Sequence, residues 1–288
     1  MAKPILANKK ICFVGAGAMA EAILRGVIDK GIAHADHVFV VNRHNQNRLQ
    51  ELRRTYGVQI HSDKKVQERF IADADIVLLA MKPKDVEEAL GQIKASVHKP
   101  QLIISVIAGL SIQSMLQYLE SDLAIARTMP NTSSTIGLGA TGISFSAQVT
   151  EDQRSMTMAI FEAIGIAEVV EEPLLEVVTG VSGSGPAYVY YFIEQLVEAA
   201  VEGGLSLETA KKLAVQTVLG AASMVQETGE EPAVLRKKVT SPNGTTQAAL
   251  EKMDELGFPN AVKQAVHRSS ERARELGALM EIRPKEKG

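Results

Sequence analysis

The stretch Ile11–Ala20, which reads ICFVGAGAMA, decides the fold of this chain. Its first four residues form a short apolar run typical of a buried strand, and a glycine-rich turn and a helical pattern follow. In such a G-x-G-x-x-A turn the first glycine permits a tight turn, the second lets the backbone approach a pyrophosphate, and the final alanine lets the helix pack on the strand. The free N–H groups of the helix start can bind phosphate. The stretch predicts a dinucleotide site whose members are Gly15, Ala16, Gly17, Ala18 and Met19.

The rest of the first half alternates short apolar runs with helical patterns, which is typical of a doubly wound parallel sheet of the Rossmann type. We expect strands at Ile11–Val14, Val38–Val41, Ile76–Ala80, Leu102–Val106, Ala124–Met129 and Gly142–Phe145, and helices at Ala20–Lys30, Gln46–Tyr56 and Glu151–Ile164, with Pro83 opening another.

After about residue 165 the pattern becomes almost entirely helical. We expect a nucleotide-binding domain over residues 1–165 and an all-helical domain over 166–288, with helices Ala187–Glu202, Ser206–Glu227, Ala233–Val239, Thr246–Leu256 and Pro259–Leu276. The stretch Ala187–Val201 is nearly all apolar, so it needs burial on several sides. This predicts a homodimer through the helical domain. The charged segment 283–288 is expected to fray.

The end of the second strand indicates which dinucleotide binds. An NAD site usually places Asp or Glu there to accept a hydrogen bond from the ribose 2′-hydroxyl. Here the strand is followed by Asn42 and Arg43. A guanidinium can grip a 2′-phosphate, and an amide can add a neutral hydrogen bond. We expect NADP(H) to be preferred and NAD(H) to bind more weakly. The alternative is that Arg43 is only a loop charge on the surface.

Composition excludes several classes of function. The formal net charge of −3 and the pI of about 6.1 do not favour nucleic-acid binding, which needs a basic patch. The single Cys12 cannot form an internal disulfide, and we expect it to be a small buried side chain. No metal site is predicted from the scattered His residues. Residues 1–4 start no secretory h-region and no apolar stretch is long enough to span a membrane, so we expect a cytoplasmic protein without a membrane partner.

Five motifs in order resemble the pyrroline-5-carboxylate reductase family. They are Ala80–Pro83 (AMKP), Ser105–Gly109 (SVIAG), Arg127–Thr132 (RTMPNT), Thr179–Tyr188 (TGVSGSGPAY) and Val239–Thr246 (VTSPNGTT). The resemblance implies a Rossmann domain followed by an all-helical dimerisation domain, with dimers often assembled into a ring. It also implies NADPH-linked reduction of a cyclic imino acid, 1-pyrroline-5-carboxylate, to proline.

The first two motifs follow strand ends, where ligands bind in this fold, so both loops should lie beside the cofactor. This adds Ala80, Met81, Lys82, Pro83, Ile107, Ala108 and Gly109 to the expected cofactor-binding residues. Gly183, Gly185 and Pro186 of the fourth motif either bring backbone close to the nicotinamide or form a hinge.

The fifth motif is the expected substrate cradle, because a polar turn before a helix offers N–H groups and hydroxyls to a carboxylate. Its expected members are Ser241, Asn243, Gly244, Thr245 and Thr246. The resemblance makes Thr246 the catalytic hydroxyl that hydrogen-bonds the ring nitrogen and places Thr245 beside the carboxylate. The same turn also suits a simple helix cap.

The resemblance further makes Glu172 a substrate-binding residue, although a surface acidic pair with Glu171 is an equal alternative. Two positions depart from the family pattern: Ser133 replaces a proline, and Asn243 replaces a glycine. Asn is the residue other than glycine that best tolerates a left-handed conformation, so we expect the 241–246 turn to keep its shape.

Three other functions share parts of this pattern. β-Hydroxyacid dehydrogenases carry a lysine where this chain has Val189, which cannot transfer a proton. A reductase acting on a six-membered imine fits the sequence as well. A nucleotide sensor without turnover would not need the Thr245-Thr246 pair, and fold alone does not decide function.

Overall fold

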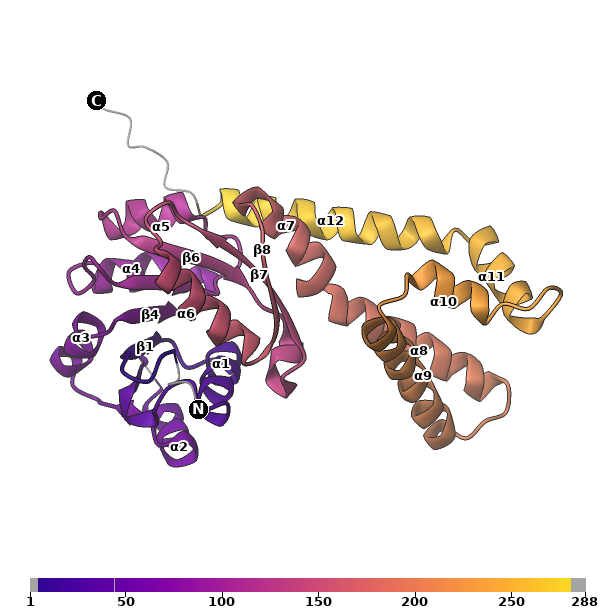
Figure 1. Ribbon diagram of the computed structural model, residues 1–288, viewed down its shortest axis with the longest axis horizontal. Coiled ribbons are helices and arrows are strands. Elements are labelled where there is room, and N and C mark those ends of the chain that lie inside the picture. Colours follow the sequence, from indigo (N-terminus) through magenta and orange to yellow (C-terminus); the bar gives the residue numbers. More distant parts are fainter. Residues whose placement is uncertain (1–4, 44, 281–288) are drawn as a thin grey trace, which may run out of the picture. The chain divides into compact units, whose positions relative to one another are not determined.

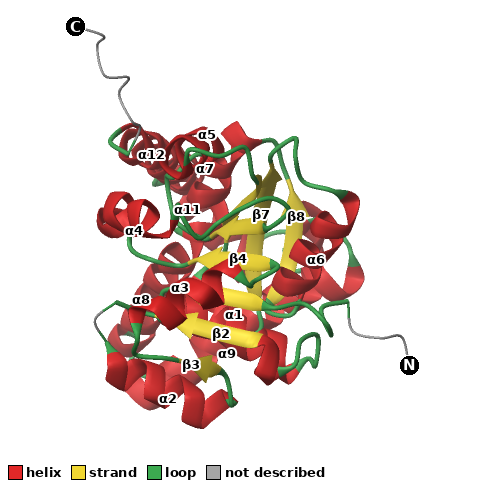
Figure 2. Cartoon of the chain, turned by 90° about the vertical axis from the view of Figure 1, so that its left-hand side faces the viewer, coloured by secondary structure: helices red, strands yellow, loops and turns green. Residues whose placement is uncertain are grey.

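An eight-stranded sheet forms the centre of the larger part of the chain (Figures 1 and 2). The computed structural model describes residues 5–43 and 45–280. The strand order is β3-β2-β1-β4-β5-β6-β7-β8, and only the β6–β7 pairing is antiparallel. The strands are β1 (Ile11–Val14), β2 (Val38–Val41), β3 (Gln59–Ile60), β4 (Ile76–Leu79), β5 (Leu102–Ser105), β6 (Ala124–Met129), β7 (Gly139–Phe145) and β8 (Gly165–Val169).

Helices cover both faces of this sheet. They are α1 (Ala18–Asp29), α2 (Gln46–Tyr56), α3 (Lys64–Ala72), α4 (Val86–Ile93), α5 (Ile112–Leu119), α6 (Glu151–Glu162) and α7 (Leu175–Val178). Short turns precede or join some of them, namely η1 (Ala35–His37), η2 (Pro83–Asp85), η3 (Thr132–Ile136), η4 (Glu172–Leu174) and the π-helical η5 (Thr179–Gly183).

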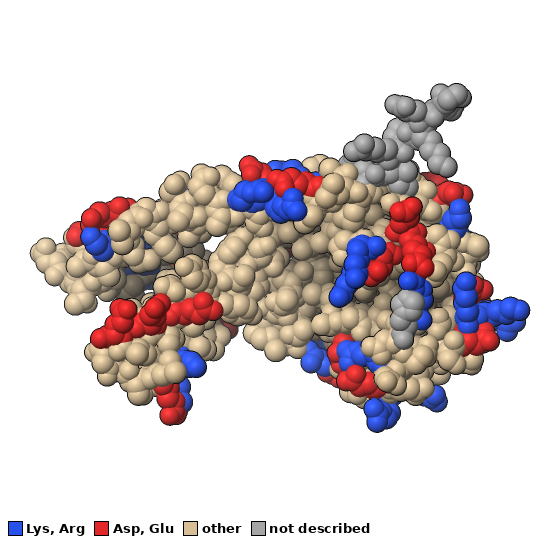
Figure 3. Space-filling model, turned by 180° about the vertical axis from the view of Figure 1, so that it is seen from behind, with Lys and Arg blue, Asp and Glu red and all other residues tan. Residues whose placement is uncertain are grey.

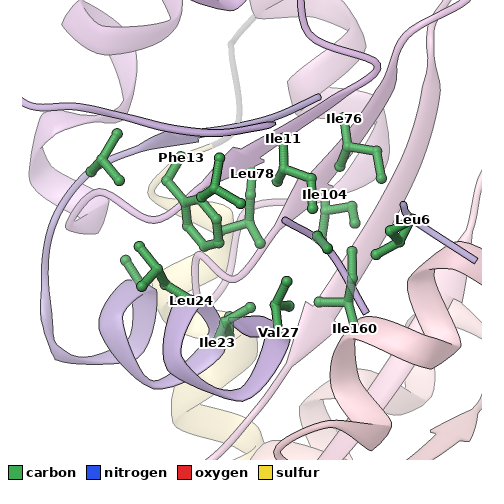
Figure 4. Packing of buried hydrophobic residues seen from close by; sticks show 14 of the residues in the cluster. Leu6, Ile11, Phe13, Ile23, Leu24, Val27, Ile76, Leu78, Ile104 and Ile160 are labelled. Carbon is green, nitrogen blue, oxygen red and sulfur yellow. The ribbon is translucent and has the colours of Figure 1, made fainter. Parts of the chain in front are cut away.

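Successive side chains of the central strands point to opposite faces of the sheet, and this produces two separate hydrophobic cores. In β1, Phe13 packs in the core that contains side chains of α1, α2 and α6, whereas Cys12 and Val14 pack in the core formed with α3, α4 and α5. Figure 4 shows Ile23, Leu24 and Val27 of α1 facing residues of the strands. The expectation that Cys12 is a buried apolar side chain is confirmed, since it is 0% exposed.

The predicted strands and helices of the first half are confirmed, with end shifts of a few residues. For example, β7 starts at Gly139 rather than Gly142, and Pro83 opens the turn η2 before α4. Five elements were not predicted: β3, β8, α3, α5 and α7. β3 has only two residues, and β8 is an edge strand whose residues are half-buried or exposed, so neither shows a clear apolar pattern.

By compactness the chain divides into two units, one of residues 1–183 with 268–288 and a smaller one of residues 184–267. The boundary expected after residue 165 separates a cofactor-binding domain from a substrate-binding and dimerisation domain, and it stays a prediction. The expected fraying of residues 283–288 lies outside the described residues. The helices of the second half are α8 (Gly185–Glu202), α9 (Leu207–Thr228), α10 (Pro232–Lys238), α11 (Thr245–Glu255) and α12 (Phe258–Ala278), of which α12 contributes to both units.

Within the smaller unit, α8 and α9 pack against each other, and Phe192 of α8 lies 6.4 Å from Phe258 of α12 between ring centroids. No residue of α8 is buried within the chain, and Tyr191 is 66% exposed. Tyr190 and Phe192 beside it are 57% and 38% exposed, and neighbouring exposed apolar side chains are typical of an interaction site. None of the helices in the described part of the chain has the length and apolarity needed to cross a membrane.

A histidine joins α3 to the loop before β5. The Nδ1 and Nε2 atoms of His98 lie 2.9 Å from the carbonyl oxygens of Lys99 and Ala72. A neutral imidazole can donate to only one of these oxygens, whereas the protonated ring donates to both. Both hydrogen bonds raise the pKa of His98 above its usual value, and the bond to Lys99 has the larger effect.

Candidate functional site

A cavity of about 660 Å³ opens at the carboxyl ends of β1, β2 and β4. This is the position where open α/β sheets bind ligands, and the volume suits a cofactor. Its lining includes eight of the residues predicted to bind the cofactor: Gly15, Ala16, Gly17, Asn42, Arg43, Ala80, Met81 and Lys82. The cavity belongs entirely to the larger unit.

The glycine turn has the shape that a pyrophosphate needs. Gly15 has a φ of 118°, and a Cβ there would lie 2.5 Å from the carbonyl oxygen of Ala80, so only glycine fits. A Cβ on Gly17 would meet no atom within 4 Å. Gly17 is also the N-cap of α1 and makes no side-chain cap bond, so the helix start keeps N–H groups for an anion. These residues fit a dinucleotide cofactor.

Arg48 supports this turn from α2. Its Nε donates to the carbonyl oxygen of Ala16 at 3.2 Å, and its guanidinium pairs with Glu51 at 2.7 Å and with Glu21. Tyr56 donates to the other oxygen of Glu21 at 3.1 Å. Arg48 thus ties α2 to the start of α1 and holds one carbonyl of the glycine turn. No sequence signal indicates this role, because Arg48 has the pattern of an ordinary charge on a helix.

Cations predominate around the cavity. Among the described residues its lining contains Arg43, Arg48, Lys64, Lys82 and Lys84 but only the carboxylates of Glu68 and Asp85. Such an excess suits a polyanionic ligand. On the face of the larger unit that Figure 3 shows, acidic and basic side chains lie next to one another. Arg43 itself forms an ion pair with Glu88 of α4.

Six predicted cofactor residues are not part of the cavity lining: Ala18, Met19, Pro83, Ile107, Ala108 and Gly109. The loop after β5 packs instead on the last turns of α12 within the same unit. A Cβ on Gly109 would lie 2.6 Å from the Cε of Met280 and 3.2 Å from the backbone nitrogen of Gly277. Cofactor contact by these six residues stays a prediction.

The predicted substrate residues of the fifth motif form one turn of the smaller unit, at the start of α11. Asn243 has a φ of 59°, which confirms the expected left-handed conformation. Its N–H donates to the side chain of Gln247 at 2.8 Å, and the N–H of Gly244 donates to the carbonyl of Ser241 at 3.0 Å. The N-cap residue Gly244 makes no side-chain cap bond. A helix start of this kind leaves N–H groups that can bind an anion, and substrate binding by this turn stays a prediction.

The third motif holds the connecting segment 172–183 on the sheet. Arg127, with a side chain only 8% exposed, pairs with Glu172 at 3.1 Å and with Glu176 at 2.7 Å. Asn131 donates from Nδ2 to the carbonyl of Ser182 at 3.0 Å. The motif therefore anchors the helical segment that leads into the smaller unit.

Glu172 lies in this anchor. Its Oε1 accepts hydrogen bonds from the backbone N–H of Ile112 at 2.8 Å and from Arg127. The carboxylate thereby binds the first turn of α5, where the helix dipole favours a negative charge. Neither partner could be predicted from the sequence. A substrate contact by Glu172 stays a prediction.

Known proteins match this chain along most of its length. A family model described as pyrroline-5-carboxylate reductase dimerisation matches residues 172–276, and one described as coenzyme F420-dependent NADP oxidoreductase matches residues 10–109. Pyrroline-5-carboxylate reductase 2 of Bacillus subtilis (strain 168) is 43% identical over 93% of this chain and 95% of its own length.

Solved structures give the same result. A pyrroline-5-carboxylate reductase from Coxiella burnetii has a TM-score of 0.87 and 34% identity, covering 93% of this chain and 98% of that one. The Plasmodium falciparum pyrroline carboxylate reductase with NADP bound has a TM-score of 0.82 and 29% identity, covering 94% and 98%.

Proposed function

This chain belongs to the pyrroline-5-carboxylate reductase family, and from that premise we propose that it reduces 1-pyrroline-5-carboxylate to L-proline with hydride from NADPH, the final step of proline synthesis. The observation that carries the proposal is the 43% identity to a reductase over 95% of that relative's length. Two helix starts without a side-chain cap bond support the proposal, that of α1 at the cavity and that of α11 after the 241–246 turn, because such starts can bind a phosphate or a carboxylate.

The cofactor would be held by the residues around the cavity and would supply the hydride. The glycine turn and the start of α1 would bind its pyrophosphate, and Arg43 and Asn42 would bind the 2′-phosphate. The absence of a carboxylate at the end of β2 favours this phosphate, since Asp or Glu there would repel it.

The 241–246 turn binds and orients the substrate. The first N–H groups of α11 and the hydroxyl of Thr245 hold the carboxylate. The hydroxyl of Thr246 accepts a hydrogen bond from the ring nitrogen, which carries a proton in the reactive iminium form. The bound cofactor would supply hydride to the neighbouring carbon of the protonated imine, so the residues of the chain have to orient the substrate and keep its nitrogen protonated, and no strong base is needed.

The decisive experiment is a reductase assay with 1-pyrroline-5-carboxylate and each nicotinamide cofactor in turn. We expect turnover with both cofactors and a higher kcat/KM with NADPH. A six-membered cyclic imino acid in a parallel assay tests the ring size. Absence of turnover with the five-membered substrate, in protein that binds NADPH, contradicts the proposal.

Thr246→Ala tests the substrate role of the turn. We expect kcat/KM to fall about 10- to 100-fold, the range of one hydrogen bond to a charged group, with little change in NADPH affinity. Thr246→Ser keeps the hydroxyl and is the matched control. Turnover of Thr246→Ala equal to that of the unaltered protein would remove the assigned role.

Arg43→Ala tests the preference for the phosphorylated cofactor. NADPH binding should weaken by about 10- to 100-fold, because a charge-assisted contact is lost, while NADH binding changes little. Equal losses of affinity for both cofactors would show that Arg43 does not bind the 2′-phosphate.

The dimerisation match and the exposed apolar residues of α8 support a homodimer through the helical domain, and further assembly into a ring is part of the same proposal. Sedimentation of the full chain should give the mass of one dimer or of a whole number of dimers. Tyr191→Glu places a charge on the exposed face of α8 and should lower that mass. A monomeric parent protein would contradict this part.

A further inference from the structure

Arg43 is shared between the cavity and helix α4. It follows β2 and lines the cavity, and its guanidinium pairs with Glu88 in the first turn of α4. Both side chains are accessible to solvent, at 43% for Arg43 and 59% for Glu88. The hydrogen bond to Glu88 is the main reason why the pKa of Arg43 lies above its usual value, and the negative charges of Glu88 and Asp85 add to it.

We propose that Glu88 is a specificity-determining residue that competes with the 2′-phosphate of the cofactor for Arg43. The inference rests on the proposed function, in which Arg43 binds that phosphate. A 2′-phosphate can bind the guanidinium of Arg43 only if the hydrogen bond between Arg43 and the Glu88 carboxylate breaks, because both anions use the same planar set of donors. NADH has no 2′-phosphate and binds with the pair intact. Glu88 therefore weakens NADPH binding and leaves NADH binding unchanged.

The size of the effect follows from the exposure of the pair. Exposed ion pairs contribute little, which corresponds to about 1.4- to 5-fold in Kd. Loss of the direct repulsion between Glu88 and the phosphate acts in the same direction. Removing the charge of Glu88 should thus tighten the binding of any ligand that carries the 2′-phosphate by about this factor.

Glu87 provides a matched control on the same turn of α4. It is an exposed carboxylate in the first turn of the helix, so Glu87→Gln removes the same charge from the same helix end as Glu88→Gln. The two substitutions share any general effect of net charge or of the helix dipole. Of the two, only Glu88→Gln removes the ion pair with Arg43.

Titration calorimetry at one fixed salt concentration tests the inference without any turnover. The probes are adenosine 2′,5′-bisphosphate against ADP, which lacks the 2′-phosphate, and then NADPH against NADH. In Glu88→Gln we expect about 1.4- to 5-fold tighter binding of the two 2′-phosphate ligands and no change for the other two. Glu87→Gln should bind all four as the parent does. In an Arg43→Ala background Glu88→Gln should lose its specific effect.

Unchanged or weaker NADPH binding in Glu88→Gln, with Arg43→Ala still selective against NADPH, overturns the inference and leaves the proposed cofactor preference intact. Weaker binding would mean that Glu88 orients Arg43 for the phosphate. If Arg43→Ala weakens both cofactors alike, the cofactor preference and the inference both fail, while the reductase assay still decides the reaction.

Discussion

Replacing Arg127 by methionine should destabilise the larger unit strongly. Methionine has a similar length and no charge, so Glu172 and Glu176 lose their shared counter-ion. The Arg127 side chain is 8% exposed, and those of Glu176 and Glu172 are 12% and 29% exposed. Two carboxylates would then stay in a poorly solvated position that also anchors the connecting segment.

The cost can be estimated from these exposures. Removing one partner of a buried ion pair costs about 3–5 kcal/mol, because an uncompensated charge is left behind. Glu176 is the more buried carboxylate and should account for most of this cost. Glu172 is more exposed and keeps its hydrogen bond from Ile112. We therefore expect a loss near the lower end, about 3 kcal/mol in the free energy of unfolding.

Urea unfolding followed by circular dichroism measures this loss, at several protein concentrations because association shifts apparent stability. Adding Glu172→Gln and Glu176→Gln to Arg127→Met should recover much of the loss, since no unpaired charge then remains. Lys212→Met is the control: its pair with Glu208 is 75% and 80% exposed, and it should cost less than about 1 kcal/mol. A comparably small loss for Arg127→Met, or no recovery in the triple variant, refutes the reasoning.

Three further outcomes are expected. Arg48→Met frees the carbonyl of Ala16 and should weaken NADPH and NADH alike in calorimetry; selective weakening of NADPH would instead mean that Arg48 contacts the 2′-phosphate. Gly15→Ala places a Cβ 2.5 Å from the carbonyl oxygen of Ala80, so cofactor binding should be lost and the Tm lowered; near-parental binding would contradict the steric restriction at this turn. Because two carbonyl oxygens raise the pKa of His98, the stability that its protonation adds should be full below its unfolded pKa of about 6.5 and disappear as the pH rises through the folded value. The difference between the unfolding free energies of the parent and His98→Gln should therefore become smaller at alkaline pH, and a constant difference would exclude this linkage.

Much of the fold could be predicted because short apolar runs and helical spacings are separated by turn residues. β1 and β2 were predicted to the residue, and α2 as well, since each has a regular pattern between turn residues. α3 was not predicted, although Asp63 caps it through two backbone N–H groups. α3 has only nine residues, fewer than the window of about 11 to 18 in which a helical period is recognised, and only Ile71 among them is buried.

In the candidate site, too, some residues could be predicted from the sequence and others could not. The positions of the glycine turn and of the strand-end residues follow from the fold, because strands of a parallel sheet end at one edge. The residues that surround them from α2, α3 and α4 were missed. Arg48, Lys64 and Glu88 have the pattern of solvated charges on helices, and nothing in their local sequence distinguishes them from other surface charges.

The sequence by itself determined the nucleotide turn, the alternation of strands and helices, and the left-handed residue at 243, because backbone conformation and apolar periodicity depend on neighbouring residues. Only the tertiary structure decided which charges meet. The pair between Arg127 and Glu172 joins residues 45 positions apart, and Arg43 at the end of β2 meets Glu88 on α4. Such contacts arise from the packing of whole elements, and no local pattern encodes their partners.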